Sequence, residues 1–211
     1  MLSALILAPL AIFCIFYGSF IFMAMVMAAA LVTAHEWYNM VKGFQNAVAM
    51  MLWGMIYIST SYFSFIFLRF GFEEGAWITL TVMLCVWASD IFAYVCGKAF
   101  KGPKMAPTIS PNKTWSGLAG AVIGFTAVLI LFMLYAPLGL HAAPFYGLIL
   151  AGLVLGVSAQ AGDLMISRLK RKAGLKDTGN LIPGHGGLLD RIDALMLIAP
   201  LSLLLLLLLQ G

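Results

Sequence analysis

Charge is scarce in this sequence. Only 9% of its 211 residues are Asp, Glu, Lys or Arg, while 63% are hydrophobic and the mean hydropathy is +1.03. This composition excludes an ordinary soluble domain, and apolar stretches of about 20 residues recur along the chain. Membrane-spanning strands are excluded, because an open sheet leaves its backbone groups unpaired in lipid. The alternation of polar and apolar residues that is typical of a membrane barrel is also absent. We expect one all-α, polytopic membrane domain over residues 1–211.

Several signals of other protein classes are also missing. The three cysteines (Cys14, Cys85 and Cys96) lack the spacing of a metal site or a disulfide, so we interpret them as small buried hydrophobes. The phosphate-binding pattern G-x-x-x-x-G-K-[ST] is absent, which disfavours generic ATPase chemistry. The first residues lack a basic stretch, so we expect no cleavable signal peptide.

Apolar segments predict about seven transmembrane helices, at roughly 2–16, 19–41, 46–68, 75–97, 116–136, 145–165 and 190–209. With these spans, 11 of the 12 cationic residues fall on one side, Arg69 being the exception. The positive-inside rule makes that side cytoplasmic, as expected for a bacterial inner-membrane protein whose polar site faces the cytoplasm. The two small-xxx-small motifs, Gly120-x-x-x-Gly124 and Gly152-x-x-x-Gly156, favour close helix packing, with a homodimer as the alternative.

The few charges gather in one segment, residues 167–193, which holds six of the 12 Lys and Arg and three of the eight acids. Asp163 lies just before it, and Asp190 and Asp193 open the last span on one helical face. If Asp163 and Asp190 converge, they form an oxygen site that suits Mg²⁺ together with substrate phosphates. The alternatives are an ion pair for Asp163 and dipole stabilisation at a helix start for the other two.

The cations of the segment are followed by a glycine-rich turn at residues 183–187. Glycines let backbone N–H groups approach an anion, which favours phosphate binding over a plain solvated loop. His185 in this turn is a candidate phosphate ligand or proton donor, or a structural histidine.

A second cluster surrounds Asp90, because an aspartate inside a span marks a functional site by default. Downstream, residues 109–115 look like a helix start that carries hydroxyls and a cation, where Ser110 and Thr114 either cap the helix or bind an anion. Earlier in the chain, we expect Glu36 to pair with a neighbouring cation, or the Trp37 indole to mark the membrane interface.

These residues fall into motifs that resemble the phosphatidate cytidylyltransferases, also called CDP-diacylglycerol synthases. The signature is Ser167-x-Leu169-Lys170-Arg171-x4-Lys176-Asp177-x-Gly179-x2-Leu181-x-Pro183-Gly184-His185-Gly186-Gly187-x2-Asp190-Arg191-x-Asp193. Residues 90–98 and 109–115 are similar to the family's second motif, and Glu36-Trp37 to a weaker early one. The chain is short for the family, chiefly at its N-terminus.

The resemblance implies transfer of the cytidylyl group of CTP to phosphatidic acid, giving CDP-diacylglycerol and pyrophosphate at the bilayer. No nucleic acid is expected as a partner. Mg²⁺ would be held by Asp163 and Asp190, with Asp90 as a further ligand. Catalytic roles would fall to Asp163 and Asp190, together with Lys170, Arg171, Lys176, Arg191 and His185. Substrate binding would involve Lys104, Ser110, Lys113, Thr114, Ser167, Asp177, Gly186, Gly187 and Asp193.

Three other functions are compatible with parts of the pattern. A transporter would line an ion path with Asp90 and Asp163 and would show paired broken helices in two similar halves, a repeat that is absent. A non-catalytic lipid-binding protein would use the cations as a headgroup patch. A CTP-dependent enzyme for another polar lipid phosphate would share nearly all these requirements.

Overall fold

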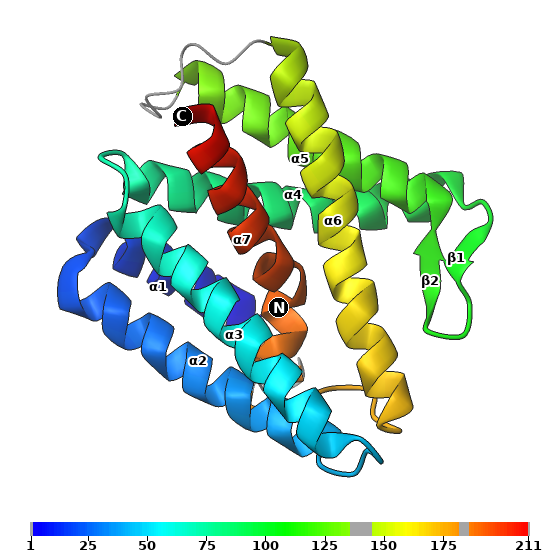
Figure 1. Cartoon of the computed structure of the whole chain (residues 1–211). Helices are drawn as coiled ribbons and strands as arrows, with labels where there is room; N and C mark the ends of the chain where they lie inside the picture. The colour runs from blue at the N-terminus through cyan, green and yellow to red at the C-terminus, as the bar shows by residue number, and fades with distance from the viewer. Residues whose placement is uncertain (1, 136–144, 182–185, 211) are drawn as a thin grey trace.

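Seven helices and one short hairpin make up the part of the chain that the computed structural model describes, residues 2–135, 145–181 and 186–210. Figure 1 shows them in chain order from blue to red. The elements are α1 (Leu2–Tyr17), α2 (Ser19–Val41), α3 (Ala47–Phe70), α4 (Gly75–Phe100), β1 (Lys104–Ala106), β2 (Ser110–Thr114), α5 (Trp115–Tyr135), α6 (Phe145–Lys172) and α7 (Leu189–Gln210).

Six of these helices, α2 to α7, are long and apolar enough to cross a membrane. The helical, polytopic fold class is therefore confirmed. The first predicted span differs from the other six: α1 has 16 residues, so it rises only about 24 Å and falls short of a bilayer core of about 30 Å.

Helix α7 lies in the middle of the bundle (Figure 1), with α1, α2 and α3 on one side, α5 and α6 on the other, and α4 crossing behind it. It packs against α3, α4 and α6, and its buried Ile198 and Ala199 join a core that includes Phe22, Leu68 and Val86. Any polar group at the first turn of α7 is therefore placed among helices from both halves of the chain.

Glycines set the distance between α4, α5 and α6. A side chain at Gly120 or Gly124 would collide with the α4 backbone, at the carbonyl oxygens of Phe92 and Ala88. A side chain at Gly152 would collide with Thr126 of α5. The packing interpretation of both small-xxx-small motifs is thus confirmed, and neither motif is available as the core of a homodimer interface.

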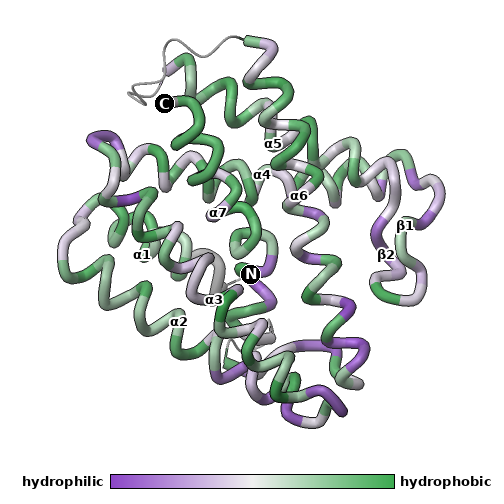
Figure 2. Tube along the Cα trace, viewed as in Figure 1, coloured by the Kyte–Doolittle hydropathy of each residue, from purple (hydrophilic) through white to green (hydrophobic). Residues whose placement is uncertain are grey.

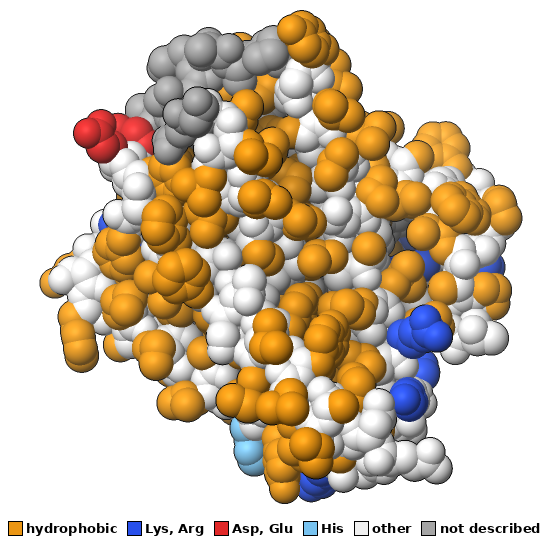
Figure 3. Space-filling model, viewed as in Figure 1, with side chains coloured by type: hydrophobic (Ala, Val, Ile, Leu, Met, Phe, Trp, Pro, Cys, Tyr) orange, Lys and Arg blue, Asp and Glu red, His pale blue; other side chains and the backbone are white. Residues whose placement is uncertain are grey.

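Polar residues concentrate at one end of the bundle, where α2 and α6 end and α7 begins, and along the hairpin (Figure 2). Apolar side chains cover most of the face in Figure 3, and Lys and Arg side chains gather beside the end of α6 and the hairpin. This distribution suits a bundle surrounded by lipid with a charged, water-facing end.

The hairpin corrects one prediction. Residues 109–115 were expected to begin a helix, but Ser110 lies in β2, which pairs antiparallel with β1. Ser110 precedes Pro111, and proline disfavours helical backbone in the residue before it. Helix α5 begins only at Trp115, where Thr114 is the cap: its Oγ1 accepts a hydrogen bond from the N–H of Gly117 at 3.1 Å. The capping role is confirmed for Thr114 and wrong for Ser110.

Candidate active site

Three polar residues line one face of α6 at its charged end. Asp163, Ser167 and Lys170 are spaced at intervals of four and three residues, which places them on the same side of a helix. That side meets the hairpin and the start of α7, so it collects charged residues that are distant in sequence.

Asp163 forms an ion pair with the hairpin. Lys113 Nζ lies 2.6 Å from Asp163 Oδ2 and also 3.4 Å from the carbonyl oxygen of Gln160. Ser167 donates a hydrogen bond to Asp163 Oδ1 at 3.1 Å. The ion-pair alternative for Asp163 is therefore what the structure shows, and its partner is a lysine that we expected to bind substrate.

Asp190 forms a second, more buried ion pair. Lys170 Nζ lies 2.6 Å from Asp190 Oδ1, and the two side chains are only 10% and 5% exposed. The other oxygen, Oδ2, accepts hydrogen bonds from the backbone N–H groups of Thr178 and Gly187, at 2.7 and 2.9 Å. Gly186, at φ 80°, supplies the left-handed turn that brings this backbone back over the aspartate.

Asp163 and Asp190 border the same contact between α6 and α7. Lys170, the partner of Asp190, lies seven residues beyond Asp163, about 10 Å along the helix axis. The two aspartates are thus not on opposite sides of the bundle. That they share one ion stays a prediction.

Two further carboxylates interact electrostatically with Asp163. Asp90 on α4 interacts with Asp163, Lys113 and Arg191, and Asp193 on α7 interacts with Asp163 and Asp90. Among the described residues, no three His, Cys, Asp or Glu side chains are placed to hold a metal by themselves. Mg²⁺ usually takes one or two protein carboxylates plus substrate phosphates, so these mutually repelling acids fit an ion that is completed by a nucleotide.

Glu36 is a site residue whose role the sequence did not indicate. We expected it to pair with a cation, but its carboxylate accepts hydrogen bonds from Thr178, Leu188 and Leu189. Its neighbour Trp37 is 2% exposed and donates to the carbonyl oxygen of Met50, so the interfacial role expected for this indole is wrong. Only the similarity of Glu36-Trp37 to an early family motif pointed to this position.

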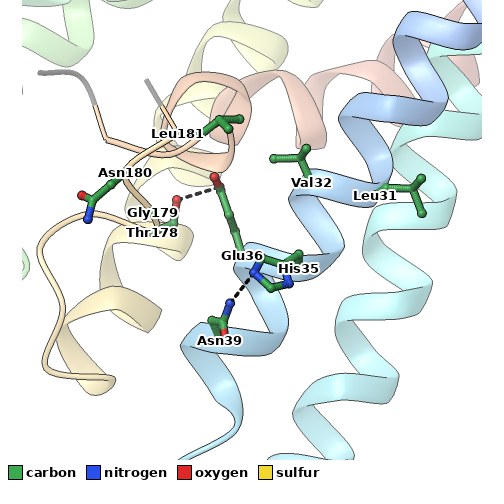
Figure 4. Close-up of a pocket in the computed structure, with 9 residues that line it drawn as sticks. All are labelled: Leu31, Val32, His35, Glu36, Asn39, Thr178, Gly179, Asn180 and Leu181. Atoms are coloured by element: carbon green, nitrogen blue, oxygen red, sulfur yellow. Dashed lines mark hydrogen bonds between the residues drawn. The ribbon is translucent and has the colours of Figure 1, made fainter. Parts of the chain in front are cut away.

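An open pocket of about 460 Å³ lies beside Glu36, between α2 and the segment that follows α6. Figure 4 shows Glu36 extending from α2 toward Thr178, and His35 and Asn39 hydrogen-bonded to each other on the same helix. Leu31, Val32 and Leu181 line its apolar part. The pocket therefore borders Thr178, whose backbone N–H donates a hydrogen bond to Asp190.

The remaining predicted residues surround this cluster. Arg171 is exposed and donates hydrogen bonds to the carbonyl oxygens of Ile109 and Leu175, both at 3.1 Å, so it ties the hairpin to the end of α6. Lys104, Lys176, Asp177 and Arg191 are exposed at the charged end. His185, with Pro183 and Gly184, lies outside the described residues.

The fold and the site define a class: a helical membrane protein with acids and bases paired at one end of its bundle. Within this class, the chain belongs to the cytidylyltransferase family, which it matches over residues 43–209. It is 37% identical to the phosphatidate cytidylyltransferase of Rickettsia felis over 206 residues, 94% of this chain and 87% of that protein. The enzyme of the same name from Brucella abortus is 42% identical over 151 residues, 70% of this chain and 53% of that protein.

Proposed function

We propose that this protein transfers the cytidylyl group of CTP to phosphatidate, forming CDP-diacylglycerol and releasing pyrophosphate. The activity named for its relatives supports this reaction. The observation that carries it is the pair of Lys–Asp ion pairs, Lys113–Asp163 and Lys170–Asp190, at the charged end of the bundle. They supply cations for phosphates and carboxylates for a divalent ion within one contact region.

The chemistry needs electrostatic help more than a base. An oxygen of the lipid phosphate attacks the α-phosphorus of CTP, and the bond from that phosphorus to the pyrophosphate oxygen breaks. The nucleophile is already an anion at neutral pH, so no proton has to be removed. The barrier arises from repulsion between two anions and from charge on the leaving group, which positioned cations reduce.

Lys113 and Lys170 are the cations that we place closest to the phosphates. Each is held by an aspartate, so its ammonium group is oriented before the substrate arrives. Arg191, Lys176 and Lys104 would add positive charge around them, and Ser167 orients Asp163. His185 and Asp177 belong to the same proposed region by their place in the signature.

Mg²⁺ is the ion that this donor set suits. Asp163 is its proposed central ligand, with Asp90 and Asp193 as neighbouring carboxylates and Asp190 as the ligand expected from the sequence. When bound, the ion would offset negative charge on the nucleotide phosphates. All these donors are hard oxygens, which favour Mg²⁺ over zinc.

The basic end of the bundle would face the cytoplasm, in the inner membrane of a bacterium, and residues 1–211 would act as one domain. Phosphatidate would keep its acyl chains in the bilayer and reach the site sideways between helices. A homodimer is compatible with this arrangement, but not through the glycine motifs of α5 and α6.

One assay tests the proposal. Purified protein in lipid vesicles is given labelled CTP, phosphatidate and Mg²⁺, and lipid-soluble label and pyrophosphate are measured. Both should appear together, and both should vanish when a chelator removes the divalent ion and return when Mg²⁺ is restored. Label with another lipid phosphate but none with phosphatidate would favour the related lipid enzyme. Solute flux without pyrophosphate would favour a transporter.

Asp163→Asn should lower the rate at least 100-fold while the protein still inserts into the membrane. Glu73→Gln is the matched control, because it removes one carboxylate from the exposed connection between α3 and α4, away from the site. A normal rate in Asp163→Asn would contradict the assignment of this residue.

A further inference from the structure

Glu36 makes an unusual set of contacts for an acid near the end of a membrane helix. It is 5% exposed, and its two carboxylate oxygens accept three hydrogen bonds from residues 142 to 153 positions later in the chain. Oε1 accepts from the N–H of Leu188 at 2.9 Å. Oε2 accepts from the N–H of Leu189 at 2.8 Å and from Thr178 Oγ1 at 2.9 Å.

Two of these donors are the backbone groups that a helix start leaves without acceptors. The first N–H groups of a helix have no intrahelical partner, and an adjacent residue usually supplies the cap. At the start of α7, the acceptor comes instead from α2. A carboxylate is also the group that a helix dipole favours at this end. Glu36 therefore caps α7 from a different helix.

Thr178 connects this cap to the proposed active site. Its Oγ1 lies 2.9 Å from Glu36 Oε2 and 3.0 Å from Asp190 Oδ2, and its N–H donates to the same Asp190 oxygen. Asp190 in turn pairs with Lys170 through its other oxygen. A continuous path of hydrogen bonds thus runs from Glu36 through Thr178 and Asp190 to Lys170.

Two glycines lie close against the Glu36 carboxylate. A side chain at Gly187 would collide with Thr178 Oγ1 and would lie 2.5 Å from Glu36 Oε2. One at Gly179 would lie 2.9 Å from Glu36 Oε1. The segment that follows α6 can therefore approach the Glu36 carboxylate closely because glycines, which have no Cβ, stand at these two positions.

We propose that Glu36 is a positioning residue of the transferase: it fixes Thr178 and the first turn of α7, and thereby the place of Asp190 and Lys170 against the substrate phosphates. This inference rests on the proposed function. Glu36 itself hydrogen-bonds to two backbone N–H groups and a hydroxyl, so the role we assign to it acts through Thr178 and α7.

The test compares Glu36→Gln with Thr33→Val. The glutamine keeps the size of the side chain but turns an NH₂ group toward one of the two backbone N–H donors, so one hydrogen bond is lost and the bonds that remain lose their charge. The valine removes another buried hydrogen bond of α2, between the hydroxyls of Thr33 and Tyr62 at 2.7 Å, which involves neither Thr178 nor α7. Both variants are measured for kcat and KM, for thermal stability, and for hydrogen exchange at the amides of Leu188 and Leu189.

For Glu36→Gln we expect kcat to fall about 10- to 100-fold, the range for one charged hydrogen bond, with a smaller change in KM for CTP. Exchange at the two amides should rise at least tenfold. Thr33→Val should lose thermal stability but keep its kcat and its amide protection. A normal kcat per folded molecule in Glu36→Gln would overturn the proposal.

Thr178→Val provides an independent measurement if the Glu36 variant fails to accumulate. It should lower kcat as well, because it cuts the path between Glu36 and Asp190, and a normal kcat would overturn the proposal. The double variant should lose less than the product of the two single losses, since both residues share the bond from Thr178 to Glu36, whereas fully multiplied losses would count against the proposal. If the unchanged protein has no activity toward phosphatidate, the proposed function fails, while amide exchange in Glu36→Gln still decides whether Glu36 holds α7.

Discussion

The Lys170–Asp190 ion pair allows stability and catalysis to be separated. Its two side chains are 10% and 5% exposed and lie 2.6 Å apart. Asp190→Asn removes the negative charge and leaves the Lys170 ammonium buried without it. Breaking a buried pair in this way costs about 3–5 kcal/mol of stability, because the remaining charge keeps its desolvation penalty without compensation.

The second variant, Lys170→Met with Asp190→Asn, removes both charges. Methionine replaces the aliphatic part of the lysine, and asparagine can still accept the N–H groups of Thr178 and Gly187 through its oxygen. Replacing a whole buried pair by neutral groups is often close to neutral for stability. The double variant should therefore regain at least about 2 kcal/mol over Asp190→Asn, while its transferase activity stays lost.

Thermal unfolding in one detergent and the CTP assay measure the two effects. Asp190→Asn should unfold several degrees below the unchanged protein, and the double variant should recover most of that difference without recovering turnover. If the double variant were no more stable than Asp190→Asn, the destabilisation would not come from an uncompensated lysine. If it regained activity, neither charge would be needed at the site.

Two further substitutions test local geometry. Gly187→Ala should abolish activity and destabilise the segment after α6, because its Cβ would collide with Thr178 Oγ1 and lie 2.5 Å from Glu36 Oε2. Gly43→Ala is the control, because this glycine has open space around it. Equal activity in the two variants would contradict the packing described for Gly187. Thr114→Ala should lower the free energy of unfolding by about 1 kcal/mol, since Thr114 Oγ1 caps α5, and the unfolding temperature checks this against Thr108→Ala in the hairpin turn.

The bundle was predictable from the sequence because length and apolarity alone decide whether a helix suits a bilayer. Six of the predicted spans are helices of sufficient length, and the break between α1 and α2 falls at Gly18, with φ 65°, between the first two predicted spans. The hairpin was not predictable in the same way. Residues 104–114 carry no apolar period, and the pairing of β1 with β2 depends on contacts between two short polar segments.

The sequence predicted which residues belong to the site but not which of them form ion pairs or hydrogen bonds with one another. The signature placed Lys170 and Asp190 in one segment, yet it could not show that they neutralise each other, since that depends on how α6 meets α7. Glu36 was harder still. Its partners lie more than 140 residues away, and no local pattern distinguishes an acid that pairs with a cation from one that caps a distant helix.

The pairing of acids and bases has a consequence for how the site can work. A charge near lipid has a high desolvation cost unless it is paired, so Lys113 and Lys170 are each matched by an aspartate before any substrate binds. A phosphate without a cation could bind the two lysines only if Asp163 and Asp190 lost their ion pairs. These acids would then lie without a counter-charge in a region that also contains the carboxyl groups of Asp90 and Asp193. A nucleotide that arrives with a divalent cation would satisfy both sets at once, since its phosphates would pair with the lysines and its cation with the acids. We therefore expect the proposed site to bind the metal complex of CTP in preference to the free nucleotide.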